Sequence, residues 1–302
     1  MADATLLITG GAGFTGRHLI AAANQKGYRC IAMVQNEGPE APTAFDTVVA
    51  DLLDPASLEH AILEVKPDYI VHLAAISFVA HSNTAEIYEV NQLGTINLLD
   101  AIRKNAPEIK KVLVASSANI YGNTGALPIT ESVPPAPVNH YGMSKVAMEL
   151  ATRLYADLPI ILSRPFNYTG CGQSPNFMIP KIVNAFKERK RAIELGNLDV
   201  SRDFSDVRDV VAAYLRLLGT DISAQAYNIC SGTATSLLSV IDSLNELTGY
   251  DIQVSINSNF IRSDEIKTLY GSPALLEAVI GNYRKYALSD TLAWMLAEKQ
   301  AA

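Results

Sequence analysis

A glycine-rich turn near the N-terminus constrains the fold of this chain more than any other feature. Three glycines spaced G-x-x-G-x-x-G follow the apolar run Thr5–Thr9 and open a helical pattern. A strand that enters a helix through glycines lets the backbone approach a pyrophosphate at the helix N-terminus. A tight turn without a ligand is the alternative, since the usual spacing is G-x-G-x-x-G. The dinucleotide contacts predicted in this turn are Gly10, Gly13, Phe14, Thr15 and Gly16.

The first half of the chain alternates β-rich runs with helical patterns, which predicts an α/β fold with a doubly wound parallel sheet. Strands are predicted at Thr5–Thr9, Arg29–Val34, Thr47–Ala50, Asp68–Leu73, Lys111–Ser116 and Pro159–Arg164. Helices are predicted at Gly16–Lys26, Pro55–Val65, Ala85–Asn105 and Tyr141–Ala156. The segment 126–139 holds four prolines and is predicted to be a loop.

The alternation weakens beyond Arg164, where we expect a smaller C-terminal α/β lobe that binds substrate. The elements predicted there are the helices Asp206–Leu218 and Leu237–Leu247 and the strand Ala226–Ile229. The predicted division assigns residues 1–165, with about 203–235, to a dinucleotide-binding domain. Residues 166–202 and 236–302 then form the substrate-binding lobe.

Composition and charge exclude several classes of function. The 302 residues are 49% hydrophobic, which suffices for a large core, and the net charge of -7 argues against nucleic-acid or anionic-membrane partners. Cys30, Cys171 and Cys230 match no zinc or disulfide spacing, so no metal site is expected. No apolar run approaches the roughly 18 residues of a membrane span, and no signal peptide is recognised. We therefore expect a cytoplasmic protein.

A tyrosine and a lysine four residues apart suggest the chemistry. Tyr141 and Lys145 share one face of a predicted helix. A nearby cation favours the phenolate, so we expect Lys145 to lower the pKa of Tyr141 below its ordinary value of about 10. Ser117 ends the strand before this helix. Together with a bound dinucleotide, Ser117, Tyr141 and Lys145 predict hydride transfer at a carbonyl or alcohol carbon.

Short segments after the third and fourth strands complete the predicted cofactor site. Asp51 could contact adenine or serve only as a turn residue. His72 is interpreted as a hydrogen-bonded structural residue, and the small residues after it suit a cofactor cleft at the carboxyl edge of a sheet. Asn91 could bond a water or carbonyl near Lys145, or be structural. The contacts predicted in these segments are Asp51, Leu52, Leu73, Ala74 and Ala75.

The end of the second strand leaves the choice between NAD and NADP open. An acidic residue there binds the ribose hydroxyl of NAD, and a basic residue accommodates the phosphate of NADP. Gln35-Asn36 is neither. Arg17 adjoins the glycine turn, which slightly favours NADP, although it could simply face solvent.

Four arginines in the second half are candidates for diphosphate contacts, because guanidinium groups bind phosphate bidentately. Surface salt bridges are the alternative for each of them. The four residues are Arg164, Arg202, Arg208 and Arg262.

Several runs resemble the extended short-chain dehydrogenase/reductase superfamily, in particular the GDP-6-deoxy-D-mannose (GDP-D-rhamnose-forming) 4-keto reductases. These runs are Arg164–Asn167, Gly170–Gln173, Gly196–Val207 and Tyr227–Gly232. The resemblance implies a Rossmann-like fold, bound NADP or NAD, and Ser117, Tyr141 and Lys145 as catalytic residues. Departures are Tyr168 where histidine is expected and Cys171 where proline is expected. The residues assigned to the nucleotide-sugar, which is expected to be GDP-linked, are Ser77, Asn167, Arg202 and Arg262.

The residues after Ser117 distinguish the reactions of this family. Related 4,6-dehydratases need a carboxylate there to take a proton, whereas this chain has Ala118-Asn119. We therefore predict NAD(P)H-dependent reduction of the C4 keto group of a nucleotide-linked 4-keto-6-deoxyhexose, with GDP-4-keto-6-deoxy-D-mannose going to GDP-D-rhamnose. The alternatives are an NAD-dependent nucleotide-sugar 4-epimerase and a non-catalytic dinucleotide-sensing protein.

Two helices carry more apolar residues than one buried stripe needs. In similar enzymes such helices form a dimer interface, so we expect a symmetric homodimer. The apolar residues are Ile87, Val90, Leu93, Ile96, Leu98, Leu99, Val146, Met148, Leu150 and Leu154.

Overall fold

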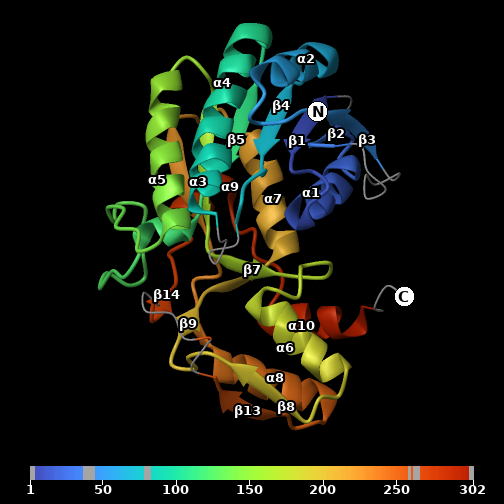
Figure 1. Cartoon of the computed structure of the whole chain (residues 1–302), viewed down its shortest axis with the longest axis vertical. Coiled ribbons are helices and arrows are strands. Elements are labelled where there is room, and N and C mark those ends of the chain that lie inside the picture. The colour runs from blue at the N-terminus through green and yellow to red at the C-terminus, as the bar shows by residue number, and fades with distance from the viewer. Residues whose placement is uncertain (1–3, 37–44, 78–82, 258–259, 261–265, 299–302) are drawn as a thin grey trace.

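A seven-stranded parallel sheet forms the centre of the computed structural model, which describes residues 4–36, 45–77, 83–257, 260 and 266–298. The strand order is β11-β6-β5-β4-β1-β2-β3, and each neighbouring pair is parallel (Figure 1). The strands are β1 (Thr5–Thr9), β2 (Arg29–Val34), β3 (Asp46–Val49), β4 (Tyr69–His72), β5 (Lys111–Ala115), β6 (Ile160–Pro165) and β11 (Gln225–Ile229).

Helices cover both faces of this sheet, because successive strand residues point to opposite sides. Leu6 and Ile8 of β1 belong to the core under α1, α7 and α9, whereas Leu7 belongs to the core under α2, α4 and α5. The predicted Rossmann-like, doubly wound α/β fold is confirmed. The helices are α1 (Phe14–Asn24), α2 (Pro55–Val65), α4 (Gly94–Asn105), α5 (His140–Thr152), α7 (Val207–Leu218) and α9 (Ala274–Ile280).

A separate hydrophobic core lies beyond the sheet, in the lower part of Figure 1. It is formed mainly by the helices α6 (Met178–Lys187), α8 (Leu237–Thr248) and α10 (Leu288–Ala297) and by the parallel pair β8 (Ala192–Leu195) and β13 (Gln253–Ile256). We call these elements the C-terminal lobe. The remaining short strands are β7 (Asn167–Thr169), β9 (Ser201–Arg202), β10 (Phe204–Asp206), β12 (Thr235–Ser236) and β14 (Thr268–Leu269).

We propose the division into domains that the sequence suggests, with residues 1–165 and about 203–235 as the dinucleotide-binding domain. Residues 166–202 and 236–302 would form the substrate-binding lobe. In support, α7 and β11 join the central sheet after the chain has passed through α6 and β8. The helix α9 is an exception, since its Leu276 packs in the core of the sheet.

The predicted elements of the first half agree with the observed bounds to within about two residues, with two exceptions. The helix predicted at Tyr141–Ala156 ends as an α-helix at Thr152 and continues as a 3-10 turn at Arg153–Tyr155. The predicted helix Ala85–Asn105 is interrupted: α3 (Thr84–Tyr88) passes into a π-helical turn at Glu89–Leu93 before α4 begins. Such turns inside helices are frequent at functional sites. In the part of the chain that the structure describes, no helix is long and apolar enough to cross a membrane.

A buried ion pair joins α5 to β6. Arg164 donates from Nε to Glu149 Oε1 at 3.0 Å and from Nη2 to Oε2 at 2.6 Å, and both side chains are almost completely buried. Arg164 also donates to the hydroxyl of Tyr121, which in turn donates to Asn228 Oδ1 at 2.7 Å. Tyr121 is therefore structural, and Arg164 is committed to a carboxylate instead of a diphosphate.

This pair gives a stability prediction. Arg164→Met should lower the free energy of unfolding by about 3–5 kcal/mol, because it leaves the Glu149 carboxylate buried without its partner. The double variant Arg164→Met/Glu149→Leu removes both charges and should recover most of that loss. Urea unfolding of the wild type and both variants measures this, and a double variant less stable than the single one would contradict it.

Candidate active site

The carboxyl edge of the sheet brings most of the predicted cofactor and catalytic residues together. The neighbouring strands β5, β4 and β1 end at Ala115, His72 and Thr9. Ser117, which is predicted to be catalytic, the small residues after β4 and the glycine turn follow these three ends closely. Ligands of doubly wound folds bind at this edge. Asp51 follows β3 at the far end of the same edge.

The glycine turn fits a dinucleotide diphosphate. Gly10 has φ +66, and a Cβ there would lie 2.9 Å from the amide nitrogen of Ala74. A Cβ at Gly16 would lie 2.5 Å from the Cα atom of Gly11. Gly13 caps α1 without a side-chain hydrogen bond, so the first amide groups of this helix suit the oxygens of a diphosphate.

Tyr141 is buried beside Ser117 in the first turn of α5, and only 8% of it is exposed. Burial raises the pKa of Tyr141 to about 12, and a hydrogen bond with Ser117 partly offsets this. The expectation that the pKa of Tyr141 lies below its ordinary value is wrong in direction, because desolvation of the phenolate outweighs the lowering effect of the Ser117 hydrogen bond.

Lys145 lies one helical turn after Tyr141 and is almost fully buried. Its ammonium donates to the carbonyl oxygen of Ala115 at 2.8 Å. Burial lowers the pKa of Lys145 to about 8, although the carboxylate of Glu149 acts in the opposite direction. The lysine is therefore charged at neutral pH at the expense of stability.

His72 is structural, as predicted. Its Nδ1 lies 2.7 Å from Thr9 Oγ1 and its Nε2 lies 2.9 Å from Thr95 Oγ1. Burial, followed by the charge of Lys145, lowers the pKa of His72 to about 3. This imidazole is neutral at neutral pH and fixes the end of β4 beside β1.

Asn91 belongs to the π-helical turn and ties the loop after β4 to α5. Its Oδ1 accepts from the Ile76 amide at 2.8 Å, and its Nδ2 donates to the Ile76 carbonyl at 3.1 Å. The same Nδ2 lies 3.0 Å from Ser144 Oγ. The sequence left open whether Asn91 is structural or bonds a water or carbonyl near Lys145. The observed contacts are those of a structural residue.

Asp51 makes the contacts of a turn residue. Its Oδ1 accepts from the amide of Leu53 at 2.8 Å, and its Oδ2 accepts from Gln35 Nε2 at 3.0 Å. Gln35 is the residue after β2, so this bond joins the two positions expected to meet the adenosine. Leu52 is buried, and its carbonyl accepts from Asn97 Nδ2. Contacts of Asp51 and Leu52 with adenine remain proposals.

The residues predicted to bind nucleotide-sugar are less closely grouped. Ser77 is exposed after β4, and Asn167 is exposed at the start of β7. Arg202 lies on β9, where its Nη1 donates to the carbonyl oxygens of Ser201 and Lys267. Arg262 lies outside the described residues.

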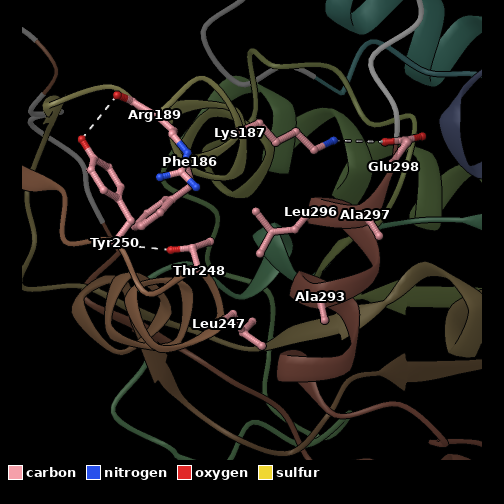
Figure 2. A pocket seen from close by; sticks show the side chains of 10 residues that line it. All are labelled: Phe186, Lys187, Arg189, Leu247, Thr248, Tyr250, Ala293, Leu296, Ala297 and Glu298. Atoms are coloured by element: carbon pink, nitrogen blue, oxygen red, sulfur yellow. Dashed lines mark hydrogen bonds and ion pairs between the residues drawn. The ribbon is translucent and has the colours of Figure 1, made fainter.

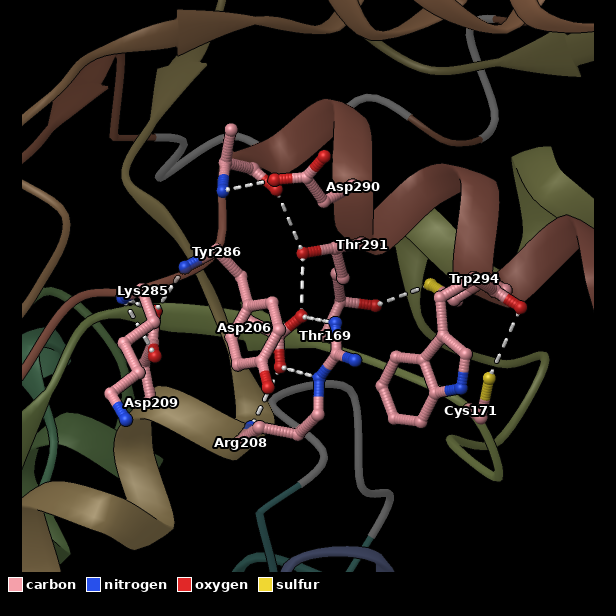
Figure 3. Close-up of polar contacts among 12 residues, drawn as sticks. Thr169, Cys171, Asp206, Arg208, Asp209, Lys285, Tyr286, Asp290, Thr291 and Trp294 are labelled. Atoms are coloured by element: carbon pink, nitrogen blue, oxygen red, sulfur yellow. Dashed lines mark hydrogen bonds and ion pairs between the residues drawn. The ribbon is translucent and has the colours of Figure 1, made fainter.

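Arg208, another diphosphate candidate, is part of a polar network that anchors α10 (Figure 3). It forms a bidentate pair with Asp206, and its guanidinium lies 3.6 Å from the ring centroid of Tyr286 and 3.9 Å from that of Trp294. Asp206 Oδ2 also accepts from Thr291 of α10 at 2.7 Å. The structure thus assigns Arg208 to the joint between the sheet and the C-terminal lobe.

Sequence reasoning missed the role of Tyr168 in contacting the glycine turn. Its hydroxyl lies 2.8 Å from Thr15 Oγ1, and its ring stacks on Phe14 at a centroid distance of 6.1 Å. Neighbouring strand residues point to opposite sides, so Tyr168 turns toward α1 while Asn167 turns away from it. The departure from an expected histidine at this position was the available signal.

A surface cavity of about 650 Å³ lies away from these residues, between the C-terminal ends of α6, α8 and α10 (Figure 2). Its lining includes Phe186, Leu247 and Leu296, and Lys187 pairs with Glu298 at 3.9 Å. None of the predicted site residues lines it. The proposed chemistry therefore does not involve this cavity.

Comparison with known proteins defines the class. The profile of the NAD dependent epimerase/dehydratase family matches residues 6–230, and the chain belongs to this family, a branch of the extended short-chain dehydrogenases/reductases. Its members act on nucleotide-sugars and depend on NAD or NADP, and the chain is accordingly an enzyme of this class.

Three relatives are informative. The GDP-6-deoxy-D-talose 4-dehydrogenase of Aggregatibacter actinomycetemcomitans is 38% identical over 92% of this chain and 91% of its own length. The GDP-6-deoxy-D-mannose reductase of Pseudomonas aeruginosa is 32% identical over 97% and 96%. The structure of RMD from Pseudomonas aeruginosa complexed with NADPH superimposes with a TM-score of 0.85 at 30% identity, covering 98% of both chains.

The burial of Lys145 gives a prediction with opposite effects on stability and activity. Lys145→Met should abolish turnover. It should also raise the free energy of unfolding at pH 7 by roughly 2 kcal/mol, because it removes the cost of burying the ammonium and loses only the hydrogen bond from that ammonium to the Ala115 carbonyl. The pKa of Lys145 in the folded state, about 8, lies below its ordinary value of 10.5. Burying the charged lysine therefore lowers the free energy of unfolding of the wild type below pH 8, and this loss disappears as the pH rises from about 8 to 10.5. The gap between variant and wild type should thus narrow over that interval.

Urea unfolding of both proteins at pH 7, 8.5 and 10 measures this gap. Lys66→Met, on an exposed helix end, is the control and should show no such pH-dependent difference. A Lys145→Met variant that is less stable than the wild type at pH 7 would contradict the assigned cost.

Proposed function

We propose that this enzyme uses NADPH or NADH to reduce the C4 keto group of GDP-4-keto-6-deoxy-D-mannose. The observation that carries the proposal is the buried pair of Ser117 and Tyr141 beside Lys145, at the sheet edge that also holds the glycine turn. Two hydroxyl donors and a cation at one point suit a carbonyl oxygen that gains negative charge.

The names of two relatives support one substrate. 6-Deoxy-D-talose and 6-deoxy-D-mannose differ only in configuration at C4, so oxidation at C4 gives the same 4-keto sugar from either. A dehydrogenase for the first GDP-sugar and a reductase for the second therefore share this keto compound. We propose GDP-D-rhamnose as the product, and hydride delivery to the opposite face would give GDP-6-deoxy-D-talose.

The roles of the residues follow from their protonation. The pKa of Tyr141, about 12, keeps the phenol protonated at neutral pH, which is the form that can give a proton to the C4 oxygen. Ser117 would donate a hydrogen bond to that oxygen. Lys145 would hold the nicotinamide ribose and place its positive charge nearby, and Tyr141 would also contact the cofactor. The bound reduced dinucleotide supplies the hydride. Ala118-Asn119 offers no carboxylate base, which supports reduction over dehydration.

Binding roles are proposed for the other residues at the carboxyl edge. The glycine turn would hold the diphosphate of the dinucleotide, Asp51 and Leu52 its adenosine, and the backbone after β4 its nicotinamide half. Ser77, Asn167, Arg202 and Arg262 would contact the nucleotide-sugar.

The decisive experiment supplies purified protein with GDP-4-keto-6-deoxy-D-mannose and each reduced cofactor. We expect one reduced cofactor to be consumed per sugar, and the NMR coupling between H3 and H4 identifies the product, since it is large for rhamnose and small for talose. Tyr141→Phe should lower kcat by roughly 10²–10⁴, the usual contribution of a positioned acid.

Two other results would replace this proposal. Tightly retained NAD, with interconversion of nucleotide-sugars and no net use of cofactor, would indicate a 4-epimerase. Cofactor binding without turnover of any keto-sugar nucleotide would indicate a sensing protein.

Tyr214→Phe is the control for Tyr141→Phe. It removes the hydroxyl of another buried tyrosine, on α7, and should leave kcat close to that of the wild type.

We also propose a symmetric homodimer that pairs α4 and α5 of two chains. These helices lie side by side at one flank of the sheet (Figure 1). Leu93, which ends the π-helical turn before α4, is 50% exposed. Leu150 on α5 is 51% exposed, and Leu154, in the 3-10 turn Arg153–Tyr155 that continues α5, is 78% exposed. Exposed leucines grouped in this way are typical of an interface.

The dimer predicts a specific mass change. Light scattering at micromolar concentration should give twice the chain mass of 32.6 kDa for the wild type. Leu150→Glu/Leu154→Glu should give monomers, because the new charges would be buried without partners at the interface. Leu63→Glu, on an equally exposed leucine of α2, should remain dimeric. A monomeric wild type would exclude the proposal.

A further inference from the structure

The hydroxyl of Ser117 is held by two donors from one residue. The backbone amide of Asn119 donates to Ser117 Oγ at 3.2 Å, and the side-chain Nδ2 of Asn119 donates to the same oxygen at 3.1 Å. Ser117 thereby caps the 3-10 turn Ala118–Tyr121 that follows β5. Asn119 is partly buried, and Ser117 is buried.

These contacts fix the direction in which the serine proton points. A serine hydroxyl has one proton and two acceptor positions. The two Asn119 donors occupy both acceptor positions, so the hydroxyl can act toward any third group only as a donor.

We propose that Asn119 is a positioning residue that fixes Ser117 as a hydrogen-bond donor to the reacting C4 oxygen. The inference rests on the proposed reduction, in which that oxygen gains negative charge and needs donors. A serine free to rotate would spend part of its time as an acceptor. By filling both acceptor positions, Asn119 preorganises the donor before the substrate binds.

The local backbone makes this arrangement rigid. A Cβ on Gly142 would lie 2.6 Å from the carbonyl oxygen of Asn119, so the residue is pressed directly against α5. The same helix carries Tyr141. A change in the chemistry of the Asn119 side chain, without a change in size, should therefore alter the polarity of the Ser117 hydroxyl and leave the backbone in place.

Asn119→Asp is that change. A carboxylate cannot donate and would accept the serine proton, turning it away from the substrate. We expect kcat to fall by about 10- to 100-fold, as for loss of one donor to a developing oxyanion. The KM for the keto sugar and the Kd for the reduced dinucleotide should stay within about threefold, because the substitution keeps the size of the side chain and leaves the backbone in place.

A pH profile separates this role from a merely structural one. As pH falls from 8 toward 4, a growing fraction of the introduced carboxyl group is protonated and can donate again, so kcat of Asn119→Asp should rise relative to wild type. Asn119→Ala keeps the backbone donor and should show a smaller loss with no such rise. Asn105→Asp removes a comparable side-chain bond, to the carbonyl of Ala101, and should match wild type throughout.

Three results would overturn the inference. Asn119→Asp with wild-type kcat and an unchanged pH profile would show that the side chain does not set the serine proton. A loss confined to NADPH affinity would assign Asn119 to binding. A wild type that consumes neither NADPH nor NADH with any keto-sugar nucleotide would remove the proposed function and this inference with it, whereas the first two results leave the function standing.

Discussion

The close approach of α5 to the loop after β5 is the constraint on which the site depends. Gly142 touches the carbonyl of Asn119, where any side chain would force the helix outward. The approach places Tyr141 beside Ser117, and it lets Lys145 reach the carbonyl at the end of β5. A displacement of about 1 Å here is enough to disrupt hydrogen bonds that must form in a fixed geometry.

The same approach explains why the site is costly to fold. It buries a phenol and an ammonium group in a region that includes the neutral His72, and burial shifts both pKa values away from the charged form. For the phenol this cost is useful, since a protonated tyrosine is the form that reduction needs. For the ammonium it is a penalty on stability, and the proposed role of its charge beside the reacting groups gives a reason for that penalty.

The sequence predicted the sheet well because continuous apolar runs and glycine turns are local signals. Leu6, Leu7 and Ile8 form such an uninterrupted run, which indicates that both faces of the sheet are covered. In the C-terminal lobe the sequence predicted α8 to within one residue but none of the other elements. Its short strands pair residues far apart, as β8 does with β13, and such pairing leaves no local signal. The interruption at Glu89–Leu93 also depends on a distant contact, that of Asn91 with the loop after β4.

Within the candidate site, residue identity was predictable and electrostatic balance was not. The four-residue spacing predicted that Tyr141 and Lys145 share one helix face. The direction in which the pKa of Tyr141 is shifted depends on burial, which the spacing does not encode. The arginines show the same limit. Arg164 and Arg208 have the right chemistry for phosphate, and only the fold reveals that Glu149 and Asp206 already hold them.

The contacts of Tyr168 show how the two halves of the molecule are set relative to each other. Through Thr15 and Phe14 this residue fixes β7 against the first turn of α1. The strand β7 pairs with β10, whose Asp206 holds α10 of the C-terminal lobe. Asn167 is the neighbour of Tyr168 on β7. The contacts of Tyr168 with Thr15 and Phe14 therefore also fix where Asn167 lies relative to the glycine turn. A phenol at this position can reach Thr15 across the joint, and the departure from histidine thus has a structural reason.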